Sequence, residues 1–259
     1  MKRVIHNGLE FDTFESFNKL GITHAFFTRK GGVSPDPWSS LNMGGTVGDD
    51  IERVRQNRRK AFQAINLSIE KSFDVWQVHS NKVIKVEQPR DPSTPYIQAD
   101  GMLTNKKGLV LFMRFADCVP ILLADPQRQV IGIVHAGWKG TLTKIVQVAI
   151  STMQTQYGSN PADIVAGIGP SIGMHHYQVG DEVLAAAQET IPELIHEVFQ
   201  VKKEQIFFDL WRANELILQN NGVKSIELAE QCTACHTEDW FSHRAEHGRT
   251  GRFGVLISL

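Results

Sequence analysis

The chain has 259 residues, of which 42% are hydrophobic and 21% charged, and its formal net charge is −1. This length allows a sizeable core, and no internal repeat, low-complexity tract or long linker divides the sequence, so we expect one domain over residues 1–259. The near-zero charge argues against nucleic-acid binding, which depends on clustered Lys and Arg, and favours a small neutral or anionic substrate.

The cysteines and the N-terminal residues indicate a compartment. Three Cys are too few, and odd in number, for a secreted disulfide scaffold, which favours a reducing environment. Residues 1–8 contain no apolar stretch of the kind a signal peptide needs, and no apolar run approaches ~18 residues. We therefore expect a cytoplasmic protein without a membrane span.

The first predicted elements are a strand and a long loop. Residues 22–28 have strand character, and a loop rich in Gly and Pro follows over 30–50. Loops of this length are commonly functional or disordered. The Trp38, Asn42 and Gly44 of this loop favour an ordered binding loop.

A helix is predicted after that loop. Asp49, with Glu52 three positions later, resembles a helix-capping signal, and apolar residues at helical spacing predict a helix over about 50–66. Three prolines in residues 88–95 then predict a surface loop.

Three near-continuous apolar runs fill the middle of the chain, at residues 109–115, 119–124 and 130–134. Continuous rather than alternating apolar character indicates strands covered on both faces. The last two runs are joined by residues 125–128, which predicts a β-hairpin at the centre of the protein.

The remaining pattern is mainly helical. Residues 141–157 carry an apolar face and stop at Gly158, which predicts a helix whose N-terminus points back toward His135. Two further helices are predicted over 181–189 and 209–221. The chain ends in a predicted strand, 253–258.

Three residues that can bind a transition metal stand beside strand-like runs: His79, Cys118 and His135. Zinc sites with three protein ligands leave the fourth tetrahedral position to water or substrate, and such sites are usually catalytic. Their wide separation along the chain excludes a compact finger motif. Only the fold can therefore bring the three groups together.

The hairpin supports two of the three residues independently. Cys118 lies just before its first strand and His135 just after its second, so both stand at the same end of an antiparallel pair. A lone His or Cys beside an apolar run is more often a packed core residue than a ligand. His79 has no such independent support.

A second cluster, Cys232-Thr233-Ala234-Cys235-His236, has the spelling of a c-type haem attachment site. That interpretation requires export, and the sequence has no signal peptide. Half of a structural zinc site is another interpretation, but the second Cys pair is missing because Cys118 is the only other cysteine. Plain structural cysteines are the third interpretation.

Several segments, taken together, resemble one known family: residues 28–34, 40–44, 47–50, 77–79, 116–118, 135–141 and 250–252. They resemble the family first named polyphenol oxidase, or laccase-like, and later recognised as a purine nucleoside phosphorylase. The resemblance covers nearly the whole chain, and the segments around Cys118 and His135 are highly specific to that family. The cluster at Cys232 is where the chain departs from the family pattern.

The resemblance implies an α+β fold of four layers, with mixed β-sheets in the centre and helices outside. It implies a zinc ion held by His79, Cys118 and His135. It also implies phosphorolysis of adenosine, inosine, guanosine and methylthioadenosine with inorganic phosphate, and deamination of adenosine by the same enzyme.

The residue types suit this chemistry. Zinc with an open position lowers the pKa of bound water to roughly 7, and the resulting hydroxide can attack purine C6. Phosphorolysis needs a bound phosphate, which cationic side chains could hold. The candidates are Arg29, Arg58, Lys139 and Arg244. We also expect Asn42 to contact the nucleoside, and Asp117, beside Cys118, to accept a proton or to support the metal ligands.

Three other functions stay open. In a metal-free cysteine hydrolase or deamidase, Cys118 would be the nucleophile and His135 its base. A copper-dependent polyphenol oxidase would need many ligands in His-x-His pairs, but the chain has ten His and no such pair, so bound copper would be adventitious. In a non-catalytic zinc protein, a fourth ligand such as His243 or His175 would close the site. The preferred nucleoside and the formation of a homodimer stay open as well.

Overall fold

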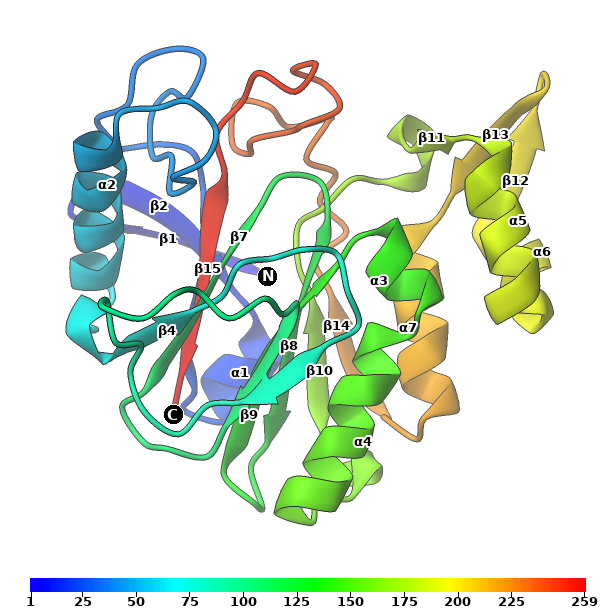
Figure 1. The fold of residues 1–259 in the computed structure, drawn as a ribbon, viewed down its shortest axis with the longest axis horizontal. Helices are drawn as coiled ribbons and strands as arrows, with labels where there is room; N and C mark the ends of the chain where they lie inside the picture. Colours follow the sequence, from blue (N-terminus) through cyan, green and yellow to red (C-terminus); the bar gives the residue numbers. More distant parts are fainter.

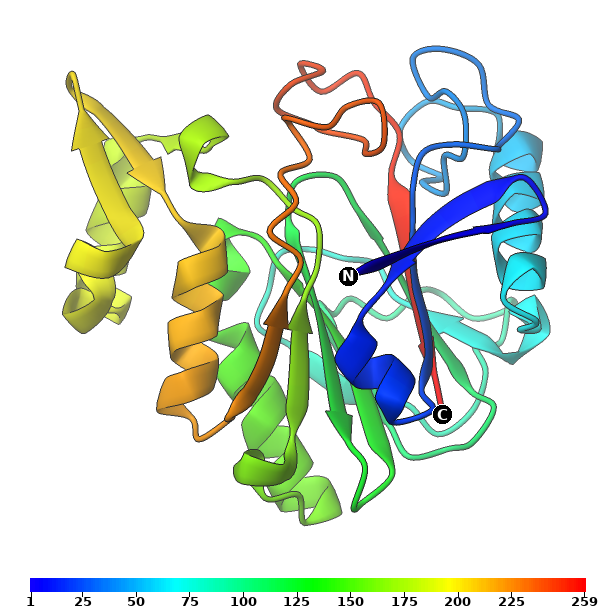
Figure 2. The same ribbon diagram turned by 180° about the vertical axis from the view of Figure 1, so that it is seen from behind.

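Two six-stranded β-sheets lie at the centre of the molecule, with helices on their outer faces (Figure 1 and Figure 2). The computed structural model describes residues 1–259. The first sheet has the order β1-β2-β3-β15-β7-β4, with the bounds Lys2–His6, Leu9–Thr13, Thr23–Phe27, Phe253–Ser258, Val110–Phe115 and Ser72–Asp74. The second has the order β14-β10-β8-β9-β6-β5, with the bounds Ser225–Leu228, Val165–Ile168, Val119–Asp125, Val130–Ala136, Gly101–Thr104 and Val83–Lys85.

A small third sheet stands at one side of the molecule (Figure 1). Its order is β11-β13-β12, with the bounds Gln178–Val179, Gln205–Phe208 and Phe199–Lys202. The α-helices α1 to α7 have the bounds Glu15–Lys19, Ile51–Ala64, Trp138–Leu142, Ile145–Tyr157, Asp181–Thr190, Ile195–Val198 and Leu210–Asn220. None of these helices combines the length and the apolar character needed to cross a membrane.

Both large sheets are mixed. The pairs β4 with β7, β5 with β6, and β10 with β14 are parallel. The remaining pairs of the two sheets are antiparallel.

The side chains of β8 show why its sequence is apolar without alternation. Val119, Ile121 and Leu123 face the helices and join a core cluster with α4 and α7. Leu122 and Ala124, on the opposite face of the strand, join a second cluster with side chains of the first sheet. Both faces of the strand are therefore covered, as the continuous apolar run predicted.

A third core cluster covers the other side of the first sheet. Val110 and Phe112 of β7 pack there with Ala61 and Phe62 of α2. The layers therefore follow the order α2, first sheet, second sheet, and α4 with α7. The predicted four-layer α+β arrangement, with mixed sheets inside and helices outside, is confirmed.

The predicted hairpin is confirmed, and one helix cap is corrected. Strands β8 and β9 pair antiparallel from Val119 opposite Ala136 to Asp125 opposite Val130. The cap of α2 is Asp50, whose side chain accepts from the backbone N–H groups of the first turn. Asp49, predicted as the cap, instead accepts hydrogen bonds from its own long loop.

The prediction of one continuous helix over residues 141–157 is wrong near its start. The chain forms α3 and α4 separately, and Lys144 between them has a left-handed backbone with φ of 57°. The Thr143 hydroxyl donates to the carbonyl oxygen of Lys139 at 2.8 Å, and such bonds compete with continued helix. The turn was not visible in the sequence because Lys favours helix.

Candidate metal centre and cavity

The side chains of His79, Cys118 and His135 converge at one end of the second sheet. Their ligand atoms all lie within 4.8 Å of one another, and Cys118 Sγ is 3.7 Å from His79 Nε2. The hairpin brings Cys118 and His135 together, because Cys118 immediately precedes β8 and His135 of β9 pairs with Pro120. His79 arrives from the loop between β4 and β5.

A buried carboxylate fixes two of these residues. Asp100 is fully buried and accepts a hydrogen bond of 2.9 Å from His135 Nδ1. It also accepts from the backbone N–H of Val78, His79 and Ser80, at 3.2, 3.0 and 2.7 Å. These bonds hold His79 in a left-handed backbone with φ of 60°, which is uncommon for a residue other than glycine. A carboxylate that orients a histidine in this way is common behind metal ligands.

Charge is concentrated at this group. Burial disfavours the thiolate, but the neighbouring His135 outweighs it and lowers the pKa of Cys118 to about 6. Burial likewise opposes the charge of His135, yet Cys118 and Asp100 raise its pKa to about 9. Each of the two side chains therefore favours the charged form of the other.

Asp117 holds the backbone that presents Cys118. Its carboxylate accepts from Thr233 Oγ1 and from the backbone N–H of Arg244, both at 2.6 Å. Its own backbone is left-handed, with φ of 79°. Because both carboxylate oxygens are occupied by these donors, Asp117 fits the predicted supporting role better than that of a proton acceptor.

Gly137 lies so close to the group that a larger residue would disturb it. A Cβ there would lie 2.9 Å from Cys118 Sγ and 3.0 Å from His79 Cδ2. We expect Gly137→Ala to weaken zinc binding about 10- to 100-fold, the size of effect seen when residues around metal ligands change. Competition with a chromophoric chelator measures this affinity.

Gly140 supplies the matched control for that substitution. A Cβ at Gly140 would find its nearest neighbour at 3.4 Å. Gly140→Ala should therefore leave the zinc affinity unchanged. Equal affinities in the two variants and the wild type would contradict the role given to the close approach at Gly137.

The group lies in a cavity of about 550 Å³, a size typical of small-molecule sites. Its sixteen lining residues include Gly44, Gly45, Arg58, Trp76, Gln77, Tyr96, Arg114, His243 and Arg252, together with the three metal-ligand candidates. No Asp or Glu is among them. The charged residues of the cavity wall are therefore arginines, Arg58, Arg114 and Arg252.

The arginines of the cavity have too few carboxylate partners. Asp74 is shared by Arg58, Arg90 and Arg114, at 3.8, 3.0 and 2.6 Å. The guanidinium of Arg252 donates only to the backbone oxygens of residues 250 and 251. Burial lowers the pKa of Arg252 and, with the help of Arg114, that of Arg58. Their charge would be stabilised by an anion in the cavity.

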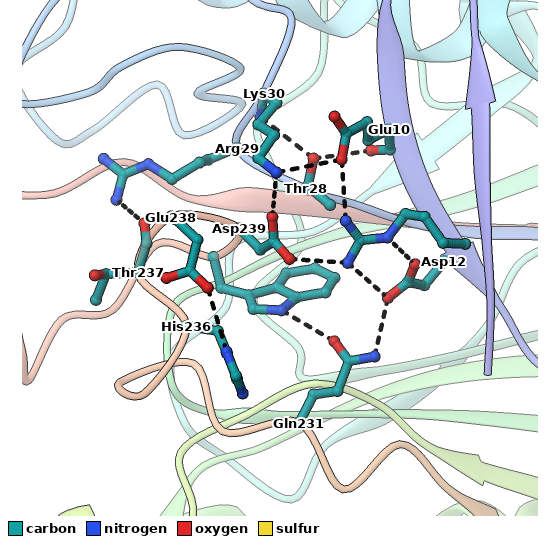
Figure 3. Close-up of polar contacts among 12 residues, drawn as sticks. Glu10, Asp12, Thr28, Arg29, Lys30, Gln231, His236, Thr237, Glu238 and Asp239 are labelled. Carbon is teal, nitrogen blue, oxygen red and sulfur yellow. Dashed lines mark hydrogen bonds and ion pairs between the residues drawn. The ribbon is translucent and has the colours of Figure 1, made fainter.

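Of the four predicted anion ligands, only Arg58 lines the cavity. Arg29, predicted as an anion ligand, lies outside the cavity. Its guanidinium donates to Ser39 O and Glu246 and to Thr237 O (Figure 3). Its donors tie two loops together.

The other two cations also lie outside the cavity. Lys139 is exposed, with Nζ over the ring of its neighbour Trp138. Arg244 donates to the carbonyl oxygens of His176 and Gln178, at 3.3 and 2.9 Å. Of the glycines beside Lys139, Gly137 is the one that approaches the metal-binding side chains closely.

The prediction that Asn42 contacts a nucleoside is corrected by its burial. Asn42 is fully buried, and its Oδ1 accepts from the backbone N–H of Gly44 and Arg252, both at 2.9 Å. Its Nδ2 donates to Asp49 at 2.9 Å. Asn42 therefore orders the long loop and sets the position of Arg252 without reaching the cavity.

No protein side chain closes the group as a fourth ligand. His243 lines the cavity but lies outside the set of mutually close donors, and His175 belongs to another cluster. The alternative of a site closed by either residue is therefore not supported by the geometry.

Sequence reasoning missed several residues of this region. Asp100 carried the signal of a lone carboxylate just before an apolar strand. Arg114 lies within an otherwise apolar strand, and Arg252 lies in a segment whose sole signal is its resemblance to the family. Trp76 and Tyr96 are large exposed aromatic side chains of the cavity wall, and nothing in their sequence context separated them from other aromatics.

Comparison with known proteins extends over nearly the whole chain. Residues 23–259 match the family described as multi-copper polyphenol oxidoreductase laccase. The protein named purine nucleoside phosphorylase YlmD of Bacillus subtilis (strain 168) is 36% identical over 250 residues, 93% of this chain and 90% of that protein. The protein named purine nucleoside phosphorylase YfiH of Escherichia coli (strain K12) is 32% identical over 243 residues, 92% and 94% of the two chains. The crystal structure of YlmD from Geobacillus stearothermophilus matches with a TM-score of 0.92 at 33% identity, covering 98% and 97%.

Proposed function

The chain belongs to the family described as multi-copper polyphenol oxidoreductase laccase, and on that premise we propose that it is a zinc-dependent purine nucleoside phosphorylase that also deaminates adenosine. Its substrates are purine nucleosides and inorganic phosphate. The names of its relatives support the phosphorylase activity. Its three free cysteines suit a reducing compartment such as the cytoplasm.

One observation carries the proposal. A single cavity joins the His and Cys group to a set of arginines, with no carboxylate in its lining. Two reactions of one nucleoside need two kinds of chemistry within reach of one molecule. The group offers a metal centre, and the arginines offer a place for phosphate.

The donors of the group fit zinc. Two imidazoles and a thiol of lowered pKa are the ligand types that zinc prefers, and the absence of a fourth protein donor fits a catalytic site. His79, Cys118 and His135 would hold the ion. Bound there, zinc would supply Lewis acidity at the open coordination position. Asp100 keeps the Nδ1 of His135 protonated, so its Nε2 is free to act as the ligand.

The arginines suit the phosphate of phosphorolysis. In this reaction a phosphate oxygen forms a bond to the sugar C1′ while the bond from C1′ to the purine nitrogen breaks, and the base takes the electron pair. Arg252 and Arg58 would hold the phosphate in place and stabilise its charge. Gly44 leaves room for this, since a Cβ there would lie 2.7 Å from Arg252 Cγ.

The aromatic side chains suit the purine. Trp76 and Tyr96 are both exposed on the cavity wall, with ring centroids 6.5 Å apart. A purine has a large flat face, and stacking on aromatic rings is worth about 1–3 kcal/mol per base. These two residues would therefore hold the base against the cavity wall.

The proposal is tested by incubating the purified, metal-quantified protein with adenosine, with and without inorganic phosphate. Chromatography should find adenine and ribose 1-phosphate only when phosphate is present, and inosine in both samples. Cys118→Ser should lose inosine formation, whereas Lys139→Met, outside the cavity, should retain both reactions. Unchanged adenosine in both samples of the zinc-bound wild type would contradict the proposed function.

A metal-free thiol hydrolase is the second candidate, favoured by the lowered pKa of Cys118 beside His135. A chelator separates the two candidates. Under our proposal, zinc removal abolishes turnover and added zinc restores it. Turnover that survives zinc removal but is lost on thiol alkylation would favour the hydrolase. Protein prepared free of copper should keep full activity, since the chain lacks the His-x-His pairs of a multicopper oxidase.

A further inference from the structure

A second group of metal-binding side chains lies outside the cavity. It consists of His175, His176, Cys232 and Cys235, whose ligand atoms all lie within 4.8 Å of one another. The histidines belong to the single 3-10 turn Met174–His176, and the cysteines belong to the loop after β14. None of the four lines the cavity. The reaction proposed above does not use them.

The spacing of these donors suits one tetrahedral ion. Cys235 Sγ lies 3.1 Å from His175 Nε2 and 3.5 Å from His176 Nδ1. Cys232 Sγ lies 3.6 Å from the same His176 atom. Tetrahedral zinc, with sulfur at about 2.3 Å and nitrogen at about 2.0–2.1 Å, places such atoms about 3.5 Å apart. Small side-chain adjustments would bring all four donors around one ion.

The backbone holds the two halves of the group together. The N–H groups of Cys235 and His236 both donate to the carbonyl oxygen of Cys232, at 3.2 and 3.1 Å, which makes a tight turn. The N–H of Gly173 donates to Cys232 Sγ at 3.2 Å. A Cβ at Gly173 would lie 2.7 Å from His175 Cε1. The close approach of the histidine ring therefore depends on this glycine.

We propose that His175, His176, Cys232 and Cys235 form a second zinc site, separate from the one in the cavity. Two thiolates and two imidazoles complete the tetrahedral coordination of zinc, which leaves no position for water or substrate. The site is therefore structural. The proposal does not depend on the reaction catalysed in the cavity.

This zinc site also accounts for the Cys-x-x-Cys-His motif, so haem attachment is not needed to explain it. The histidine of that spelling, His236, lies outside the group, with Nδ1 3.3 Å from Glu238 Oε1 (Figure 3). The other half of the donor set comes from His175 and His176, far away in the sequence. A structural zinc site needs a second pair of ligands besides Cys232 and Cys235, and His175 and His176 supply that pair.

The second site would support the first through a short path. Thr233, between the two cysteines, donates to the carboxylate of Asp117, the residue before Cys118. Arg244 links the same region, since its side chain donates to the carbonyl oxygen of His176 and its backbone N–H to Asp117. A zinc ion on Cys232 and Cys235 would therefore fix the loop that holds Cys118 in place.

Metal content in a Cys118→Ser background tests the proposal, because that background removes a ligand of the cavity site. The protein is expressed with zinc, purified under reducing conditions and analysed by mass spectrometry. We expect about one zinc per chain in Cys118→Ser, and none after Cys235→Ser or His175→Ala is added. Adding His236→Ala is the matched control and should retain the ion. Circular dichroism reports the folding of each variant, and the exposed His175 is the variant to rely on if Cys235→Ser unfolds.

Two further measurements guard against misreading the metal count. Replacement of zinc by cobalt in the Cys118→Ser protein should give thiolate-to-cobalt absorption that disappears with His175→Ala. Free thiols are counted without reductant, because a disulfide between Cys232 and Cys235 is the rival explanation of their proximity. No bound zinc in the reduced Cys118→Ser protein, or zinc that survives His175→Ala and Cys235→Ser alike, would overturn the proposal.

Discussion

Asp100→Asn is expected to lower the free energy of unfolding by about 3 to 5 kcal/mol, because it breaks the buried ion pair with His135. The amide group of the asparagine would also point its own hydrogens toward groups that donate hydrogen bonds. The carboxylate accepts from three successive backbone N–H groups, from the Ser80 hydroxyl and from His135. An asparagine retains one acceptor oxygen for these five donors. Zinc affinity should fall as well, by about 10- to 100-fold, since both histidine ligands lose their support.

Urea unfolding measures the loss of stability in Asp100→Asn, and chelator competition measures the loss of zinc affinity. The pH dependence of stability gives a further test. The hydrogen bond from His135 outweighs burial and lowers the pKa of Asp100 to about 2, from an ordinary value of 3.8. The charge therefore stabilises the fold fully above about pH 4, and this contribution is lost as the pH falls toward 2. The difference between wild type and variant should shrink over that range.

Asp91 offers the control for Asp100, because it is exposed and its carboxylate accepts only from Ser93 in its own loop. Asp91→Asn should change neither the free energy of unfolding nor the zinc affinity. If Asp100→Asn behaved like Asp91→Asn, the carboxylate would not be what holds His79 and His135.

Arg252→Met is expected to separate the two proposed reactions. Its guanidinium has no carboxylate partner and lines the cavity, so its loss should remove a main contact to phosphate. We expect kcat/KM for phosphorolysis to fall by about 10²- to 10³-fold, as when other preorganised donors to a transition state are removed. Deamination, which uses no phosphate, should be retained. Product chromatography at varied phosphate concentration measures both rates.

The control for Arg252→Met is Lys139→Met, which removes a cation of the surface. That variant should keep both activities. An equal loss of both reactions in Arg252→Met, together with a lower melting temperature, would instead indicate that Arg252 serves the fold. Its backbone N–H bond to Asn42 remains in the variant, so the loop itself should stay ordered.

The sequence predicted the central strands of this protein more completely than it predicted the residues of the metal centre and cavity. The runs at 119–124 and 130–134 predicted the hairpin, and with it the proximity of Cys118 and His135, because pairing of adjacent strands is local. His79 was supported only by resemblance. Its position depends on Asp100, a contact between segments whose pairing no local pattern reveals.

The same limit applies to the anion ligands and the second cluster. Arg29 was favoured by its neighbouring glycines, but Arg58 on α2 and Arg252 before β15 face the cavity, which depends on how the layers stack. The cysteines at 232 and 235 were visible as a pair. Their partners, His175 and His176, lie in another loop that only the completed second sheet brings alongside.

The place of β15 in the first sheet bears on how fast this protein can fold. β15 lies between β3 and β7 and is the only link between the two halves of that sheet. Pairing residues 23–26 with residues 255–258 closes a loop of most of the chain, and such distant contacts slow folding. Arg252 stands directly before β15, so its place in the cavity depends on this distant strand pairing.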